Sequence, residues 1–134
     1  MAARTLPRVV VVDDDRAVLS VVRMTLEDAG FVVQTQTSAA EALEEACTRP
    51  PALVVTDLLL PEMSGGELVG GLRAHPATSE VPVLVCSAAV DTPTARDVDA
   101  DAWLEKPFEP DDLVELVRSL TRGELRRRRG PEGT

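Results

Sequence analysis

Apolar residues along the chain switch between short, largely unbroken runs and longer stretches with helical spacing. The short runs are rich in valine and leucine, which is typical of strands covered on both faces of a sheet. They occupy residues 9–12, 31–33, 52–56, 81–86 and 102–104. The pattern therefore predicts five buried strands.

Helices are predicted between and after these runs, because apolar residues there recur at every third or fourth position and give each helix one apolar face. These stretches are residues 18–26, 38–47, 64–72 and 110–120. Ser38 and Ser64 each stand three positions before a glutamate, a capping-box pattern that begins a helix. The stretch between Ser87 and Lys106 has little helical spacing. We expect any helix there to be shortened, displaced or mobile.

Strands that alternate with helices specify one α/β domain. Five such units predict a doubly wound, five-stranded parallel sheet with helices on both faces. We place this domain at residues 8–122, after a lead of residues 1–7 and before a flexible, arginine-rich tail at residues 123–134. Ligands of such folds bind at the carboxyl ends of the strands. Candidate chemical groups should therefore be sought where each strand ends.

Composition narrows the class of protein without identifying it. The 134 residues are 44% hydrophobic and 28% charged, as in an ordinary globular domain. The net charge of -9 argues against nucleic-acid binding, which needs a basic surface. No run approaches the roughly 18 apolar residues of a membrane span, and the first residues lack a signal-peptide pattern. We expect a cytoplasmic protein without membrane contact, with Cys47 and Cys86 as free thiols.

Polar residues follow four of the five predicted strands. They are Asp13, Asp14 and Asp15 after the first, Asp57 after the third, Ser87 after the fourth and Lys106 after the fifth. Parallel strands end at one edge of a sheet, so we expect these side chains to converge. Neighbouring carboxylates all stay ionised only where a cation offsets their repulsion. Oxygen ligands open to water suit Mg²⁺ beside a phosphate, and Mn²⁺ takes similar ligands.

Asp57 stands alone at its strand end and is the candidate nucleophile. A carboxylate can attack phosphorus and form an aspartyl phosphate. Lys106, the only lysine beside thirteen arginines, supplies a compact positive charge, and Ser87 supplies a hydroxyl donor. Each residue alone has an ordinary explanation, and Asp15 in particular suits the N-cap of the following helix. The prediction depends on their joint placement at the strand ends.

Four segments resemble, in order, the signature blocks of response-regulator receiver domains. They are VVVVDDDRAVL, VVTDLLLPEMSGGEL, VPVLVCSAA and AWLEKPFEPDDLVELV, and the resemblance covers about residues 8–122. It implies the flavodoxin-like receiver fold and a phosphorylation-activated two-component switch of the stand-alone type, not a turnover enzyme. A sensor histidine kinase or histidine phosphotransfer protein would supply the phosphoryl group to Asp57. The sequence does not identify the downstream protein target.

The resemblance also implies roles within the site. Asp14 and Asp57 would bind Mg²⁺, with Asp13 assisting and the backbone carbonyl of Leu59 as a further ligand. The phosphate on Asp57 would then be held by Ser87 and Lys106.

Three further positions bear on switching and on the lifetime of the phosphate. Ser87 and Trp103 would form the switch, although receiver domains commonly have Tyr or Phe where this chain has Trp103. Polar side chains at the positions of Leu59 and Ala89 can orient an attacking water in the family. Both residues are apolar here, so we expect slow self-dephosphorylation.

Two other functions stay open from the sequence. A receiver fold could serve as a binding module that is not phosphorylated. Alternatively, Asp13 and Asp15 form a DxD pair after a strand, as in haloacid-dehalogenase-like phosphatases that use the first aspartate as nucleophile. That alternative leaves Asp57 without a role, and no Gly-Thr follows the pair. Stable labelling of Asp57 rather than Asp13 distinguishes the receiver from the phosphatase.

Overall fold

The computed structural model describes residues 6–88 and 90–124, which form one sheet of five parallel strands. The strands are β1 (Arg8–Val12), β2 (Val32–Gln36), β3 (Leu53–Thr56), β4 (Val83–Ser87) and β5 (Ala102–Glu105). Their order across the sheet is β2-β1-β3-β4-β5. The predicted doubly wound α/β fold is confirmed.

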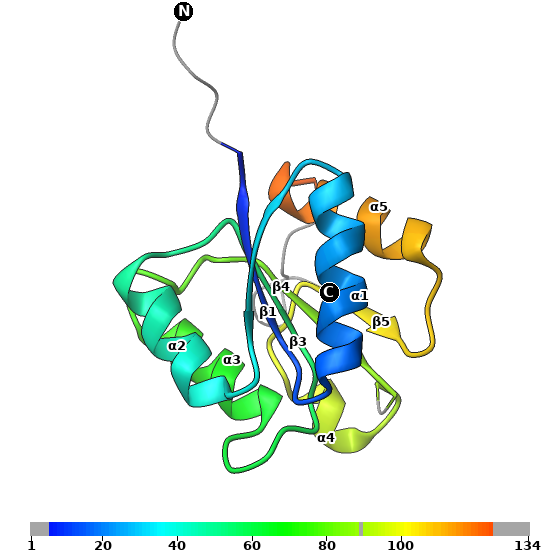
Figure 1. The fold of residues 1–134 in the computed structure, drawn as a ribbon. Coiled ribbons are helices and arrows are strands. Elements are labelled where there is room, and N and C mark those ends of the chain that lie inside the picture. The colour runs from blue at the N-terminus through cyan, green and yellow to red at the C-terminus, as the bar shows by residue number, and fades with distance from the viewer. Residues whose placement is uncertain (1–5, 89, 125–134) are drawn as a thin grey trace, which may run out of the picture.

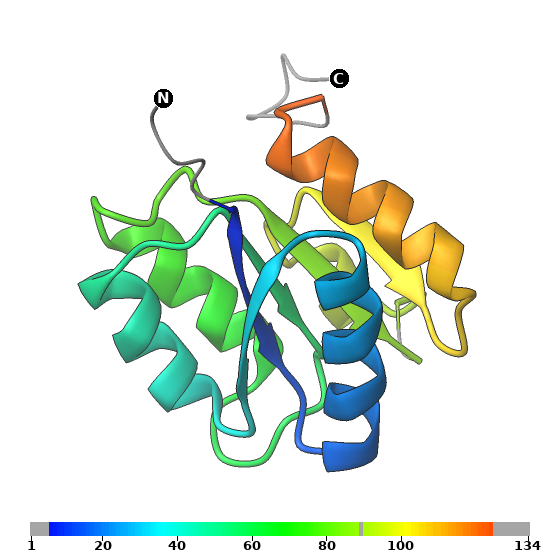
Figure 2. The same ribbon diagram turned by 45° about the horizontal axis from the view of Figure 1, so that its top comes forward.

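Helices cover both faces of the sheet, as Figures 1 and 2 show. α1 (Arg16–Asp28) and α5 (Pro110–Thr121) pack on one face, and α2 (Ala39–Thr48) and α3 (Gly65–Ala74) pack on the other. Alternate residues of each strand point to opposite faces, so in β1 Val9 contributes to the α1/α5 core and Val10 to the α2/α3 core. Two buried faces explain the unbroken apolar runs.

Two strands differ from their predicted bounds by two or more residues. The fourth strand begins at Val83 rather than residue 81, because Pro82 has no N–H to donate to a neighbouring strand. β2 continues through polar side chains to Gln36, as its place at the edge of the sheet allows. The helix that was expected to be shortened is short: α4 (Pro93–Arg96) has four residues. Of the predicted tail, residues 125–134 lie outside the described residues.

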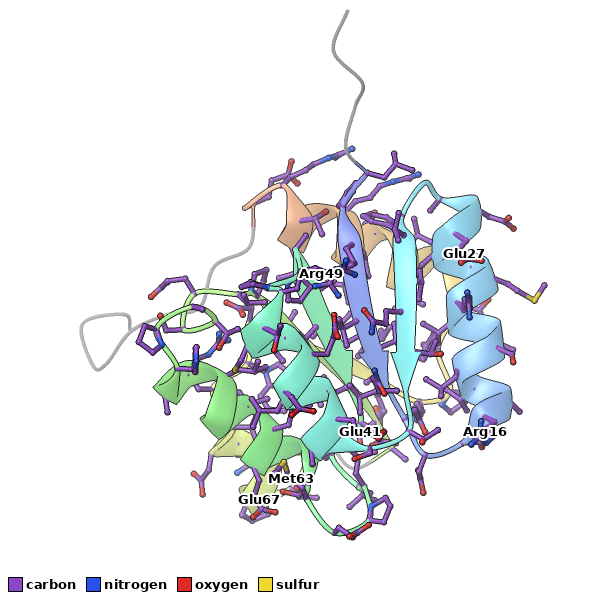
Figure 3. The ribbon with its side chains drawn as sticks, turned by 60° about the vertical axis from the view of Figure 1, so that its left-hand side comes forward. Arg16, Glu27, Glu41, Arg49, Met63 and Glu67 are labelled. Atoms are coloured by element: carbon purple, nitrogen blue, oxygen red, sulfur yellow. The ribbon has the colours of Figure 1, made fainter. Side chains whose placement is uncertain are left out.

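The helices begin at the same end of the molecule at which the strands end. In Figure 3, Arg16, Glu41 and Glu67, from the first turns of α1, α2 and α3, lie at one end of the fold, and Glu27 and Arg49 lie at the other. A helix N-terminus carries a partial positive charge. The helix N-termini therefore contribute a positive potential at the carboxyl ends of the strands.

Two predictions from composition can be compared with the structure. Cys47 and Cys86 are free thiols, and burial raises the pKa of Cys86 to about 12, so this thiol is unreactive at neutral pH. Across residues 6–88 and 90–124, we find no helix with the length and apolar character needed to cross a membrane.

Candidate functional site

Asp57 follows β3 directly, near the middle of the sheet. Its backbone N–H donates to the carbonyl of Val12 at 3.1 Å, which continues the pairing of β3 with β1 by one residue. The side chain is 12% exposed. The ends of β1 and β4 lie on either side of it, because both strands pair with β3.

Lys106 joins Asp57 to Asp13. Its Nζ donates to Oδ2 of Asp13 at 2.6 Å and to Oδ2 of Asp57 at 2.9 Å. Its backbone N–H donates to the carbonyl of Ser87 at 3.0 Å, which ties the end of β5 to the end of β4. The structure therefore brings together predicted residues that follow β1, β3 and β5.

Two further donors surround the Asp57 carboxylate. The Leu59 N–H donates to Oδ1 at 3.2 Å. The Ser87 side chain, which is fully buried, also hydrogen-bonds to the Asp57 side chain. The carboxylate is thus held by donors from β4, from the loop after β3 and from the residue after β5.

These contacts decide the protonation states. Burial alone would raise the pKa of Asp57, but hydrogen bonds from Lys106, Leu59 and Ser87 and the charge of Lys106 outweigh it, so the pKa is lowered. Burial alone would lower the pKa of Lys106, but its hydrogen bonds to Asp13 and Asp57 and their charges raise it. At neutral pH the site therefore presents an ionised carboxylate beside an ammonium.

The three consecutive aspartates occupy different environments. Asp13 is buried, and its Oδ1 accepts the N–H of Asp15 at 2.9 Å. Asp15 caps α1 by accepting two N–H groups of the first turn, as the sequence predicted. Asp14 is exposed and takes part in neither ion pair of Lys106. Since Asp15 serves the helix, the DxD interpretation lacks its second catalytic aspartate.

The donors present can be compared with the needs of Mg²⁺. In the part of the chain that the structure describes, no set of three or more acidic, histidine or cysteine side chains is grouped to hold a metal. Asp13 and Asp57 do converge on one point. Mg²⁺ commonly takes one or two carboxylates and fills its other positions with water and phosphate oxygens. Asp13 and Asp57 therefore fit this ion, while the roles of Asp14 and the Leu59 carbonyl stay predictions.

Two of the residues predicted to affect switching or the lifetime of the phosphate, Trp103 and Leu59, can be placed relative to the site. Trp103 of β5 is partly buried against the α2/α3 core and is in register with Val85 of β4, two positions before Ser87. The Leu59 side chain is 66% exposed. Ala89 lies outside the described residues. The switching and lifetime roles of these residues stay predictions.

One residue at the site was missed by the sequence interpretation. This residue is Gly65, the first residue of α3. A Cβ built on it would stand 2.0 Å from the carbonyl oxygen of Asp57. The Ser-Gly step before a capped helix was the available signal, but a contact with the backbone of a preceding strand end cannot be read from it.

Known proteins match most of the chain. The model of the response regulator receiver domain matches residues 9–118. The transcriptional regulatory protein PrrA of Mycobacterium tuberculosis is 41% identical over 133 residues, which are 97% of this chain and 54% of that protein. KdpE of the same organism is 38% identical over 117 residues, 85% of this chain and 50% of that protein. This chain therefore spans about half the length of the curated relatives that it matches.

A solved structure agrees over almost its whole length. The crystal structure of a putative response regulator from Chloroflexus aurantiacus has a TM-score of 0.83 and 31% identity, and the match covers 88% of this chain and 99% of that one.

Proposed function

The chain belongs to the response-regulator receiver family, and we propose that its Asp57 accepts a phosphoryl group from a phosphohistidine of a partner protein, with Mg²⁺ bound beside it. It is the receiver domain of a two-component response regulator, a signalling module rather than a turnover enzyme. The observation that supports the phosphorylation most directly is the ammonium of Lys106 between Asp13 and Asp57.

The groups that this chain would contribute to the transfer lie at this edge of the sheet. An oxygen of the Asp57 carboxylate attacks phosphorus, and the bond between phosphorus and the histidine nitrogen breaks. The imidazole leaves with the electron pair of that bond and takes a proton from water, while Asp57 carries an acyl phosphate. The lowered pKa of Asp57 keeps the nucleophile ionised. Lys106 and Ser87 supply a charge and a hydroxyl donor to the phosphoryl oxygens.

Asp13 and Asp57 would hold Mg²⁺, joined by Asp14 and the Leu59 carbonyl, and the ion would offset charge on the transferring group. The receiver domain of the sensor histidine kinase PA1611 from Pseudomonas aeruginosa contains a magnesium ion coordinated in its active site cleft. It is 21% identical to this chain with a TM-score of 0.79. That likeness shows the fold alone, so the support for Mg²⁺ here is the donor set.

Phosphorylation would shift the domain toward a conformer that a partner prefers. Ser87 and Trp103 are the proposed switch residues. The donor would be a sensor histidine kinase or a histidine phosphotransfer protein, and the readout would be a protein target in the cytoplasm. We propose no contact of this domain with nucleic acid, because the chain's net charge is -9.

The phosphate should be long-lived without a phosphatase. Leu59, beside Asp57, has no polar side-chain atom that could orient an attacking water, and Ala89 shares this property. We expect loss of the phosphoryl group over minutes or longer when donor is removed. A half-life of seconds would contradict this part of the proposal.

Incubation with acetyl phosphate tests the proposal. The wild type should gain a hydroxylamine-sensitive phosphoryl group in Mg²⁺ and lose this ability with EDTA. Asp57→Asn should gain none. Asp28→Asn, which changes an exposed aspartate at the end of α1, should react like the wild type. Labelling of Asp57→Asn to the wild-type extent would refute the proposal, and no labelling of the wild type would favour the unphosphorylated binding module.

A further inference from the structure

The first turn of α3 lies directly against the backbone of the proposed phosphoacceptor. A Cβ at Gly65 would stand 2.0 Å from the Asp57 carbonyl oxygen and 2.8 Å from the Leu58 Cα. Both are backbone atoms, and both distances are far inside van der Waals contact. Even alanine at this position requires a shift of α3 or of the peptide between Asp57 and Leu58.

Hydrogen bonds hold the turn in this place. The Gly65 N–H donates to the Leu58 carbonyl at 3.0 Å. Ser64 and Glu67 form a complete capping box, with the Ser64 N–H donating to Oε1 of Glu67 at 2.9 Å and the Glu67 N–H donating to Oγ of Ser64 at 3.1 Å. Figure 3 shows Glu67 and Met63, which belongs to the preceding loop, at this end of the molecule. The hydrogen bond between Gly65 and Leu58 therefore joins the two ends of the loop between β3 and α3, and the capping box fixes the start of α3.

The loop between β3 and α3 also carries the Leu59 N–H, which orients the Asp57 carboxylate. The Asp57 side chain projects from the peptide against which Gly65 packs, and its Oδ1 accepts the N–H of Leu59 at 3.2 Å. A shift of the first turn of α3 therefore moves the reactive carboxylate relative to Lys106. Reacting groups misplaced by about 1 Å can lose about 100-fold in rate.

We propose that Gly65 is a positioning residue for the phosphorylation of Asp57: the absence of a side chain at the start of α3 lets this helix seat the peptide of the nucleophile. The inference rests on the proposed function, since it concerns the same site. Gly65 has no side-chain atom that could bind a phosphoryl group. Its effect passes through the backbone of Asp57 and Leu58.

The same helix offers a matched control. Gly70 lies in the interior of α3, and a Cβ there meets nothing within 4 Å. Gly65→Ala and Gly70→Ala thus add the same methyl group to the same helix, with and without the collision.

Three measurements on both variants test the idea. In Gly65→Ala the rate of phosphorylation at saturating acetyl phosphate should fall about 10- to 100-fold. The dissociation constant for Mg²⁺, followed by calorimetry without a phosphodonor, should rise about 10-fold. Amide hydrogen exchange at residues 59 and 65 should become faster. Gly70→Ala should match the wild type in all three.

The outcomes separate this inference from the proposed function. A folded Gly65→Ala with wild-type rate and Mg²⁺ affinity overturns the positioning role. If Gly65→Ala does not fold, Ser64→Ala decides, because it loosens the capping box without adding bulk. Its rate should fall about two- to tenfold, and a wild-type rate and Mg²⁺ affinity would refute the role. If the wild type takes no phosphoryl group, the proposed function fails, and the Mg²⁺ affinities and amide exchange still test the role of Gly65.

Discussion

Two clusters, each formed by one cation and its carboxylate partners, lie at opposite ends of the parallel strands and differ in their contacts. At the carboxyl edge, Lys106 joins Asp13 and Asp57. At the amino edge, Arg73 of α3 joins Asp101, the residue before β5. We call the Lys106 cluster open, because its groups can still bind other partners, and the Arg73 cluster closed, because its groups are fully used within the protein.

The Arg73 cluster is closed because its hydrogen bonds end within the protein. The guanidinium donates to the carbonyls of Ser79, Val81 and Asp99 and to Oδ2 of Asp101, the last at 3.0 Å. The same Oδ2 accepts the N–H of Val83, the first residue of β4, at 2.7 Å. The Arg73 and Asp101 side chains are only 11% and 7% exposed. This cluster fastens the loops before β4 and β5.

The Lys106 cluster is open because its groups keep capacity for other partners. The Lys106 side chain is 20% exposed and donates to two carboxylates. Each carboxylate oxygen has two lone pairs, so an ion or a phosphoryl group can bind without unfolding its surroundings. The contrast suggests a practical criterion: a closed cluster stabilises the fold, whereas an open cluster at strand ends is available for chemistry.

The largest expected effect on stability comes from opening the closed cluster. Arg73→Met leaves Asp101 buried without its cation, so the free energy of unfolding should fall by about 3–5 kcal/mol. Urea denaturation measures it. The control is Arg23→Met, which breaks an exposed ion pair with Glu27 on α1 and should change stability by about 0.5 kcal/mol or less. Equal losses in the two variants would show that the ion pair of Arg73 with Asp101 contributes no more to stability than an exposed ion pair.

Removal of the cation from the open cluster should affect reactivity more than stability. In Lys106→Met the rate of phosphorylation by acetyl phosphate should fall about 100-fold or more, because a charge aimed at the transferring group is lost. The free energy of unfolding should fall less than in Arg73→Met. A loss of stability as large as that of Arg73→Met would mean that the Lys106 cluster, like the Arg73 cluster, mainly stabilises the fold.

The pH dependence sharpens the same contrast. The pKa of Asp57 is lowered in the folded protein, so its ionisation contributes stability above the usual aspartate pKa of about 3.9, and this contribution is lost as pH falls through the lowered pKa. Lys106→Met removes a hydrogen bond and a charge that lower the pKa of Asp57 against the effect of burial. The pKa of Asp57 should therefore be higher in this variant than in the wild type. Carboxyl ¹³C NMR titration measures both values. Identical midpoints would contradict the assigned role of Lys106.

The smallest expected effect leaves both clusters intact. Gly70→Ala fills open space on the exposed surface of α3. It should raise the free energy of unfolding by about 0.5–1 kcal/mol, because alanine favours the helix. Urea denaturation measures the gain, and the phosphorylation rate should stay unchanged. A loss of stability would mean that α3 is packed more tightly than the structure shows.

The site was predictable where it depends on the fold. The apolar runs stop before Asp13 and Asp57, and parallel strands bring both positions to one edge of the sheet. Which of the consecutive aspartates points inward was not predictable, because it depends on the turn in which Asp15 caps α1. The family resemblance implies that Asp14 and Asp57 are the main Mg²⁺ ligands, and this stays a prediction. The ion pairs with Lys106 are made by Asp13 and Asp57.

Two features could not be predicted, because they depend on contacts between distant backbone segments. Arg73 looks like an ordinary cation in the last turn of a helix, yet its partners come from the loops before β4 and β5. Gly65 looks like a weak helix former, yet it packs on the carbonyl of Asp57. Spacing along the chain carries no signal for either contact.

The position of the phosphoryl group tests the central claim most directly. After reaction with acetyl phosphate and Mg²⁺, borohydride reduction and peptide mass mapping would locate the acyl phosphate. We predict a single modified residue, Asp57. Modification of Asp13, or of no aspartate at the carboxyl edge of the sheet, would contradict the account.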